Sequence, residues 1–233
     1  MFHKLSKSIK LFALVVLIVN YASIVSAQQS VSSKTFAIER TNTLLQSVRD
    51  SSYPELQNTD IEIRLFNSKS DFFRTRFSVM RYFFGLKMHF FIEVNPKVFE
   101  LQPTEKALHA IIAHELGHVL YMQDEKRIKL FSLICLASKD YTARFERRTD
   151  LEAISRGYAT GLIEYRNWLY QNISAKNVKE KKRDYFSPEE ISAITESLKK
   201  KPALLAFWIK HIPLNLAEIK TQTESTSIQK HHF

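Results

Sequence analysis

Two histidines and a glutamate in the segment His114-Glu115-Leu116-Gly117-His118 are the residues of this chain best suited to chemistry. Helix residues four apart lie one turn apart on the same face, so the two imidazoles can reach a single metal ion. Zinc accepts neutral imidazole nitrogen at about 2.0–2.1 Å. Glu115 lies beside that face, where a carboxylate can take a proton from zinc-bound water and pass it to a leaving amine. The pattern predicts a zinc site with His114 and His118 as ligands and Glu115 as general base.

The segment around the motif indicates a buried helix. Residues 107–120 (ALHAIIAHELGHVL) are apolar nearly all round, and Thr104 is the expected N-cap of a helix that runs to about Met122. Ionisable side chains in a buried helix are costly unless they are paired or bind a metal. Core histidines that only bonded to each other would leave Glu115 unexplained, so the setting favours a metal site.

A catalytic zinc needs a third protein ligand and an open position, and three carboxylates downstream are candidates. Asp124 follows the helix directly, but no glycine turns the chain back towards the histidines. Glu146 and Asp150 are four residues apart on one helix face, so one could bind zinc while the other accepts the N–H of a ligating histidine. The two arginines after Glu146 offer the alternative of surface ion pairs. Glu152, on a different face, is the fallback ligand.

The two motifs together resemble a known family. HELGH, its lead-in at 92–113 and the E-x-x-x-D of FERRTDLEAI (145–154) are similar to the gluzincin zinc peptidases, in particular the M48 (Ste24/HtpX-like) group. The resemblance covers about residues 86–160. It implies one Zn²⁺ held by His114, His118 and Glu146, with Glu115 as base. Asp150 would then bond to a ligand instead of to the zinc. The chain departs from the family at Thr149, where Ala is usual, and it lacks the internal membrane helices of the integral members.

The resemblance and the sequence patterns imply an α+β fold, a mainly helical zincin-like metallopeptidase domain with a small sheet. Strands are expected at 61–65 and 87–94, while the aromatic-rich run 72–84 is left unassigned. The 87–94 strand is expected at the sheet edge beside the motif helix, with a peptide substrate lying along it. Helices are expected at about 36–48, 104–122, 145–169, from Ser187-Pro188, and at 202–219, with 172–185 a lysine-rich connector. The domain spans 28–219, its helical carboxy-terminal part beginning near 187, and 220–233 is expected to be a flexible polar tail.

The amino terminus has the layout of a secretory signal peptide over residues 1–27. Lys4, Lys7 and Lys10 precede a short apolar run at 11–19, and Val25-Ser26-Ala27 is a small-residue cleavage pattern. The protein is therefore expected to be periplasmic or secreted, whereas an uncleaved segment would anchor it in a membrane. Removal of these three lysines changes the formal net charge from +10 to +7, which is compatible with peripheral association with anionic membranes, although scattered lysines usually mark only a solvated face. No internal disulfide is expected, because Cys135 is the only cysteine. No nucleic-acid partner is expected either, because no basic cluster is interleaved with aromatic residues and the protein is expected to be exported.

The function expected from these residues is that of an exported zinc-dependent endopeptidase acting on protein or peptide substrates, for example in envelope protein quality control. Two alternatives remain open: a zinc-bearing, chaperone-like interaction module with weak or lost catalysis, and a metal-dependent amidase acting on cell-wall peptides. The donor that would stabilise a developing oxyanion is not identified. Four residues are candidates for it: His109, Tyr158, Tyr165 and Arg166.

Overall fold

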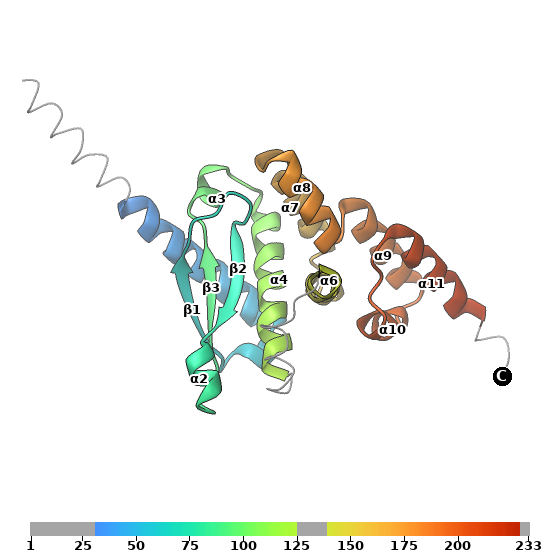
Figure 1. The fold of residues 1–233 in the computed structure, drawn as a ribbon, viewed down its shortest axis with the longest axis horizontal. Coiled ribbons are helices and arrows are strands. Elements are labelled where there is room, and N and C mark those ends of the chain that lie inside the picture. The colour runs from blue at the N-terminus through green and yellow to red at the C-terminus, as the bar shows by residue number, and fades with distance from the viewer. Residues whose placement is uncertain (1–30, 125–138, 229–233) are drawn as a thin grey trace, which may run out of the picture.

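The computed structural model describes residues 31–124 and 139–228, and this part of the chain is mostly helical with one small sheet (Figure 1). The expected α+β class is therefore confirmed. The predicted signal peptide over 1–27 and Cys135 both lie outside the described residues. Within the described ranges, no helix combines the length and apolar character that crossing a membrane requires.

The sheet has three strands in the order β1-β3-β2. Strand β1 (Asp60–Leu65) runs parallel to β3 (His89–Val94), and β2 (Phe73–Phe77) runs antiparallel to β3 on its other side. Side chains alternate along β3, where Phe90, Ile92 and Val94 are buried against the helices. The first helix (31–52) contributes Leu44 and Val48 to the same core.

The expectation that the 87–94 strand forms the sheet edge is wrong. Strand β3 is the central strand, because β1 occupies one of its edges and β2 the other. The edge beside α4 (Glu105–Asp124) is β2, which lies within the run 72–84 that the sequence pattern left unassigned (Figure 1). The sequence of β2, FRTRF, does alternate between aromatic and basic residues. Further aromatic residues before and after it in the sequence obscured this period of two.

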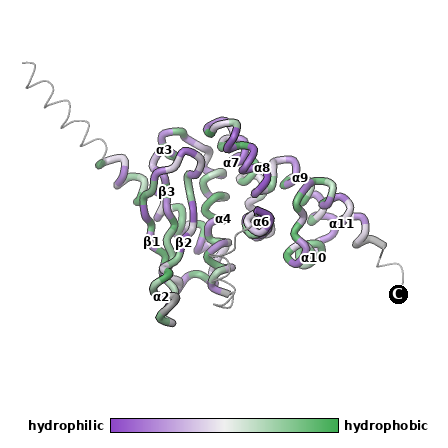
Figure 2. Tube along the Cα trace, in the orientation of Figure 1, coloured by the Kyte–Doolittle hydropathy of each residue, from purple (hydrophilic) through white to green (hydrophobic). Residues whose placement is uncertain are grey.

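Helix α4 is the central element of the fold and carries the HELGH motif. Thr104 caps it as expected, because its hydroxyl accepts a hydrogen bond from the N–H of Ala107 at 3.1 Å. The helix is buried continuously from Ala107 to Val119 except at His109. It packs against β2 on one side and against α6 (Lys139–Ser155) and α7 (Ala159–Asn172) on the other. Figure 2 shows hydrophobic residues recurring along α4 where these layers meet.

Two expected boundaries between α4 and Ser187 are wrong. The single long helix expected over 145–169 is divided into α6 and α7, because Gly157 adopts φ +93 and ends the first helix. The expected connector at 172–185 contains helix α8 (Ala175–Asp184). Ser174 begins this helix by accepting a hydrogen bond from the N–H of Asn177. Helix α8 is strongly hydrophilic (Figure 2) and buries none of its side chains.

The carboxy-terminal part begins at Ser187, as expected. A complete capping box and a proline at its first turn start α9 (Pro188–Lys200), which is followed by α10 (Leu204–Lys210) and α11 (Leu216–Ile228). The single helix expected over 202–219 is therefore wrong, since α10 and α11 divide it, and the tail expected to be flexible over 220–233 is helical as far as 228. Asn215 caps this helix by accepting from the N–H of Glu218, and buried Ile219 anchors it. Three short helices complete the described chain: a 3₁₀ helix at Pro54–Leu56, α2 (Val79–Phe83) and α3 (Lys97–Glu100).

Helices α4 and α7 approach so closely that a side chain at Gly161 has no room. A Cβ atom there would lie 2.3 Å from the carbonyl oxygen of Lys106 and 2.8 Å from the Cβ of Ala110. We expect Gly161→Ala to lower the free energy of unfolding by about 1–3 kcal/mol, roughly 3–10 °C in Tm for a domain of this size. Gly117→Ala is the matched control, since its nearest neighbour would lie at 3.4 Å. Equal Tm values for the two variants would contradict this close packing of α4 and α7.

Candidate metal centre

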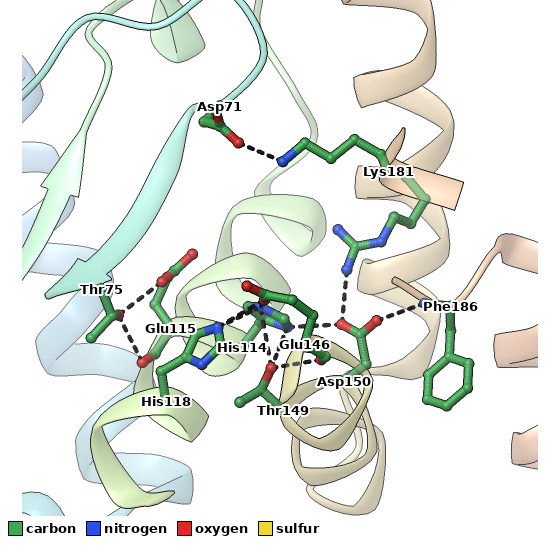
Figure 3. Close-up of polar contacts among 11 residues, drawn as sticks. Asp71, Thr75, His114, Glu115, His118, Glu146, Thr149, Asp150, Lys181 and Phe186 are labelled. Carbon is green, nitrogen blue, oxygen red and sulfur yellow. Dashed lines mark hydrogen bonds and ion pairs between the residues drawn. The ribbon is translucent and has the colours of Figure 1, made fainter. Parts of the chain in front are cut away.

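Helices α4 and α6 cross so that three side chains converge on one point (Figure 3). The Nε2 atoms of His114 and His118 lie 3.1 Å apart, and Oε2 of Glu146 lies 3.2 Å from the first and 3.0 Å from the second. His114 and His118 are buried, while Glu146 is partly exposed. The structure thus brings together the three residues expected as ligands, and this cluster could hold a metal ion.

The spacing of the three atoms fits a tetrahedral ion. Ligands at 2.0–2.1 Å from a tetrahedral centre are separated by about 3.3 Å, close to the three separations found here. Two imidazole nitrogens and a carboxylate oxygen also form the donor set that catalytic zinc sites use, with the fourth position left for water or substrate. The residues present therefore fit an ion such as zinc.

Asp150 holds His114 in the orientation that a metal ligand needs. Its Oδ1 accepts a hydrogen bond from Nδ1 of His114 at 2.8 Å, which leaves Nε2 to face the cluster. The same oxygen accepts from Nη2 of Arg166 at 2.8 Å, and Oδ2 accepts from the N–H of Phe186 at 3.0 Å (Figure 3). Burial alone would raise the pKa of Asp150, but the charge of Arg166 and these hydrogen bonds outweigh it and lower that pKa.

Helix α6 passes close to the HELGH turn at Gly117. A Cβ added at Gly117 would lie 3.4 Å from Cβ of Thr149, an ordinary van der Waals distance, so Thr149 is the residue of α6 that faces this turn. The hydroxyl of Thr149 donates to the carbonyl oxygen of Glu146 at 2.7 Å. Thr149, the residue that departs from the M48 pattern, is accommodated without displacing the ligand cluster.

The carboxylates and the imidazoles of the cluster stabilise one another's charged forms. Burial would raise the pKa of Glu146, but the neighbouring histidines reverse this and hold that pKa well below its usual range. Burial would lower the pKa of His114, but Asp150 and Glu146 raise it to about 9. A metal that binds here must therefore displace a proton, which is the ordinary linkage between metal affinity and pH.

Glu115 lies next to the cluster without belonging to it. The hydroxyl of Thr75 on β2 donates to its Oε2 at 2.8 Å and lies 3.0 Å from its carbonyl oxygen (Figure 3). Burial raises the pKa of Glu115, and the nearby histidines only partly offset this effect. A buried carboxylate with a raised pKa, held beside three converging ligands, is suited to accept and return a proton.

A cleft of about 280 Å³ opens beside the cluster, between β2 and α6. Phe73, Thr75, Glu115, Glu146 and Tyr185 are among its lining residues. A second pocket of about 20 Å³, room for roughly one water, lies on the other side of Glu115. The chain thus leaves space next to both the proton acceptor and the ligand cluster.

Tyr185 lines both spaces, and the sequence patterns did not single it out. Its ring centroid lies 5.6 Å from that of His114. Burial raises the pKa of its hydroxyl well above the usual range, so the group stays protonated and able to donate. The position directly follows α8, in the segment interpreted as a connector, and no spacing rule links it to the HELGH motif.

An ion pair between Asp71 and Lys181 joins the start of β2 to α8 above the cluster (Figure 3). Both residues line the small pocket, and Asp71 also lines the cleft. Burial would raise the pKa of Asp71, but the ammonium group of Lys181 lowers it. The pair therefore forms part of the wall of the small pocket that Glu115 also lines.

The other candidates are placed elsewhere. Glu152 accepts from Nε of Arg156 at 2.7 Å rather than joining the cluster, and the side chain of Asp124 is outside the described residues. Arg166 is committed to Asp150, Tyr158 bonds to Ser52, and His109 lies 2.9 Å from the carbonyl oxygen of Glu105. Of the four candidate oxyanion donors, only Tyr165 and Arg166 line a space beside Glu115, the small pocket.

Comparison with protein-family models, with curated proteins and with solved structures found no match to this chain. The resemblance of residues 86–160 to the M48 peptidases therefore remains an expectation from the motifs. What the site can do must be inferred from its own residues and their geometry.

Proposed function

We propose that this protein is a zinc-dependent endopeptidase of the gluzincin type, with a zincin-like domain similar to that of the M48 peptidases. The observation that carries the proposal is the convergence of His114, His118 and Glu146 beside a buried Glu115 that is not a ligand. A purely structural zinc site closes with four protein ligands, whereas a catalytic site has three and leaves a position open. The cleft beside Glu146 provides access to that position.

When bound, zinc would lower the pKa of a water molecule and polarise a substrate carbonyl. Glu115 would take the proton from the attacking water and deliver it to the leaving nitrogen, while the hydroxyl of Thr75 keeps its carboxylate in place. The charge of Asp150 would be balanced by Arg166. Asp150 would hold the proton of His114 on Nδ1, so that Nε2 is free to bind the metal. Tyr185 is the candidate donor for the developing oxyanion, since its protonated hydroxyl belongs to a side chain that lines the cleft.

The substrate would pair with β2 instead of the 87–94 strand. In the antiparallel ladder the N–H of Ser78 donates to the carbonyl oxygen of His89, and the N–H of Asn95 donates to that of Phe72. The backbone N–H and C=O groups of the even-numbered residues of β2 therefore point towards β3. The backbone N–H and C=O groups of Phe73 and Thr75 therefore point away from β3, at the open edge of the sheet. Both residues also line the cleft. An extended peptide added at this edge would run past Glu115 and the cluster.

Thr75→Pro tests this binding mode. Proline would remove the cleft-facing N–H of Thr75 while leaving the ladder to β3 intact. We expect KM for a peptide substrate to rise about tenfold, the equivalent of one to two lost hydrogen bonds. Thr75→Val is the matched control, because it loses the hydroxyl bond to Glu115 but keeps the N–H. Equal KM values for the two variants, both with full zinc, would rule out pairing at this edge.

The class of activity is tested by incubating zinc-loaded protein with casein and identifying new amino termini by mass spectrometry. Internal cleavage would support an endopeptidase. Release of amines from cell-wall peptides without cleavage of casein would favour the amidase alternative, because the same chemistry serves any amide. Full zinc occupancy with neither activity would contradict the proposal and favour an interaction module.

A further inference from the structure

The segment that links β2 to β3 exposes an unusual concentration of apolar side chains. It contains α2 and the turn at Gly85, where φ is +68. Met80 is 65% exposed and Phe84 is 71% exposed, the two largest values among the exposed hydrophobic residues of the described chain. Val79 and Leu86 are exposed as well. Large apolar side chains gathered at one place on a surface mark a site of interaction with a membrane or another protein.

The shape of this segment is a protruding tip, which we call the β2–β3 tip (79–87). Figure 1 shows α2 beyond the end of the sheet, on the far side from α8. In Figure 2 the start of α2 is hydrophobic, whereas α8 is hydrophilic. A narrow convex tip suits insertion between lipid headgroups better than it suits a broad protein interface.

The charged residues of the tip itself are all basic, and the carboxylates of Asp60 and Glu62 on the neighbouring strand β1 are paired with His89 at the start of β3. From residue 72 to residue 92 the sequence contains Arg74, Arg76, Arg81 and Lys87 and no aspartate or glutamate. Arg74 and Arg76 are paired with Glu93. Arg81 and Lys87, at the tip itself, donate to the backbone carbonyls of Lys87 and Asn58, and neither forms an ion pair with another described residue. Cations beside exposed apolar groups complement an anionic lipid surface.

We propose that the β2–β3 tip docks the protein onto an anionic membrane surface, with Met80 and Phe84 entering the headgroup region and Arg81 and Lys87 contacting lipid phosphates. Strand β2 connects this tip to the cleft. Docking would therefore hold the cleft at a fixed distance from the bilayer. The proposal does not depend on whether the metal centre is a peptidase, because the tip and the cluster share no residue.

Vesicle flotation with the full-length protein tests the proposal. We expect binding to vesicles of equal parts phosphatidylglycerol and phosphatidylcholine, and about tenfold weaker binding to phosphatidylcholine alone or in high salt. Met80→Ser/Phe84→Ser should weaken binding to the anionic vesicles about tenfold. The amino-terminal apolar run is present in every variant, so differences between variants report the tip. Since both side chains are exposed, zinc content and Tm should stay unchanged.

Two matched controls keep the proposal falsifiable. Lys176→Gln/Lys179→Gln removes charge from exposed positions of α8, and Phe207→Ser removes an exposed aromatic side chain elsewhere. Neither control should reduce vesicle binding by more than about twofold, because the attraction between a basic residue and an anionic surface falls off within a Debye length. Equal binding of wild type and the Met80/Phe84 variant would overturn the proposal. The proposal would also be overturned if Met80→Ser/Phe84→Ser abolished only self-association, measured by light scattering without lipid. The tip would then be a contact between copies of the chain.

Discussion

Glu115→Gln is expected to lower kcat for peptide hydrolysis by about 10²–10⁴-fold while zinc stays bound. General acid–base catalysis contributes a factor of this size, and the amide cannot accept the proton that the carboxylate would take. Gln has the same shape as Glu and can still accept the hydroxyl bond from Thr75, so the side chain should keep its place. The measurements are steady-state kinetics and zinc content on the same preparation.

Glu105→Gln is the matched control for this substitution. Glu105 lies on the same helix, in its first turn, and pairs with Arg40 at the surface. It should retain full activity. If Glu115→Gln hydrolysed peptides at the wild-type rate, Glu115 would not be the base and the peptidase mechanism proposed here would be wrong. Loss of zinc together with activity would instead indicate that Glu115 is needed for metal binding.

Glu146→Ala is expected to weaken zinc binding by more than about 100-fold. Changes in residues that only support ligands already cost about 10–100-fold in metal affinity, and Glu146 is placed as a ligand itself. The substitution also leaves two buried imidazoles without their shared carboxylate. Zinc affinity is measured by competition with a chromophoric chelator at neutral pH.

Glu152→Ala is the comparison for the third ligand. It lies on the same helix as Glu146, was the fallback ligand from the sequence, and pairs with Arg156 in the structure. It should bind zinc as the wild type does. A Glu146→Ala protein with wild-type affinity, or a Glu152→Ala protein without zinc, would contradict the ligand set.

Local sequence patterns predicted the parts of the site that lie on single helices. The i, i+4 spacings place His114 with His118 and Glu146 with Asp150, because helix geometry fixes which residues share a face. The crossing of the two helices was expected from the motif pair, and in the structure α4 and α6 are packed against each other, with Thr149 facing Gly117. Capping at Thr104 and Ser187 was equally predictable, since each cap depends on residues within one turn.

The parts that depend on contacts between distant segments were not predictable in this way. Strand β2 was missed because it lies within an aromatic-rich run that obscures its alternation, and the order β1-β3-β2 is a tertiary property. The expected substrate strand was consequently assigned to the wrong edge. Thr75 and Tyr185 reach Glu115 and the cleft from elements that were unassigned or interpreted as a connector. Arg166 was noticed as a candidate, but its pairing with Asp150 only appears once α6 and α7 are folded together.

The central claim is that His114, His118 and Glu146 bind one zinc ion with a position open beside Glu115. Zinc K-edge X-ray absorption on the zinc-loaded wild-type protein tests it most directly. The structure predicts one zinc per chain with two imidazole nitrogens and oxygen donors at about 2.0–2.1 Å. A protein that retains no zinc at neutral pH, or a spectrum without imidazole scattering, would contradict the claim.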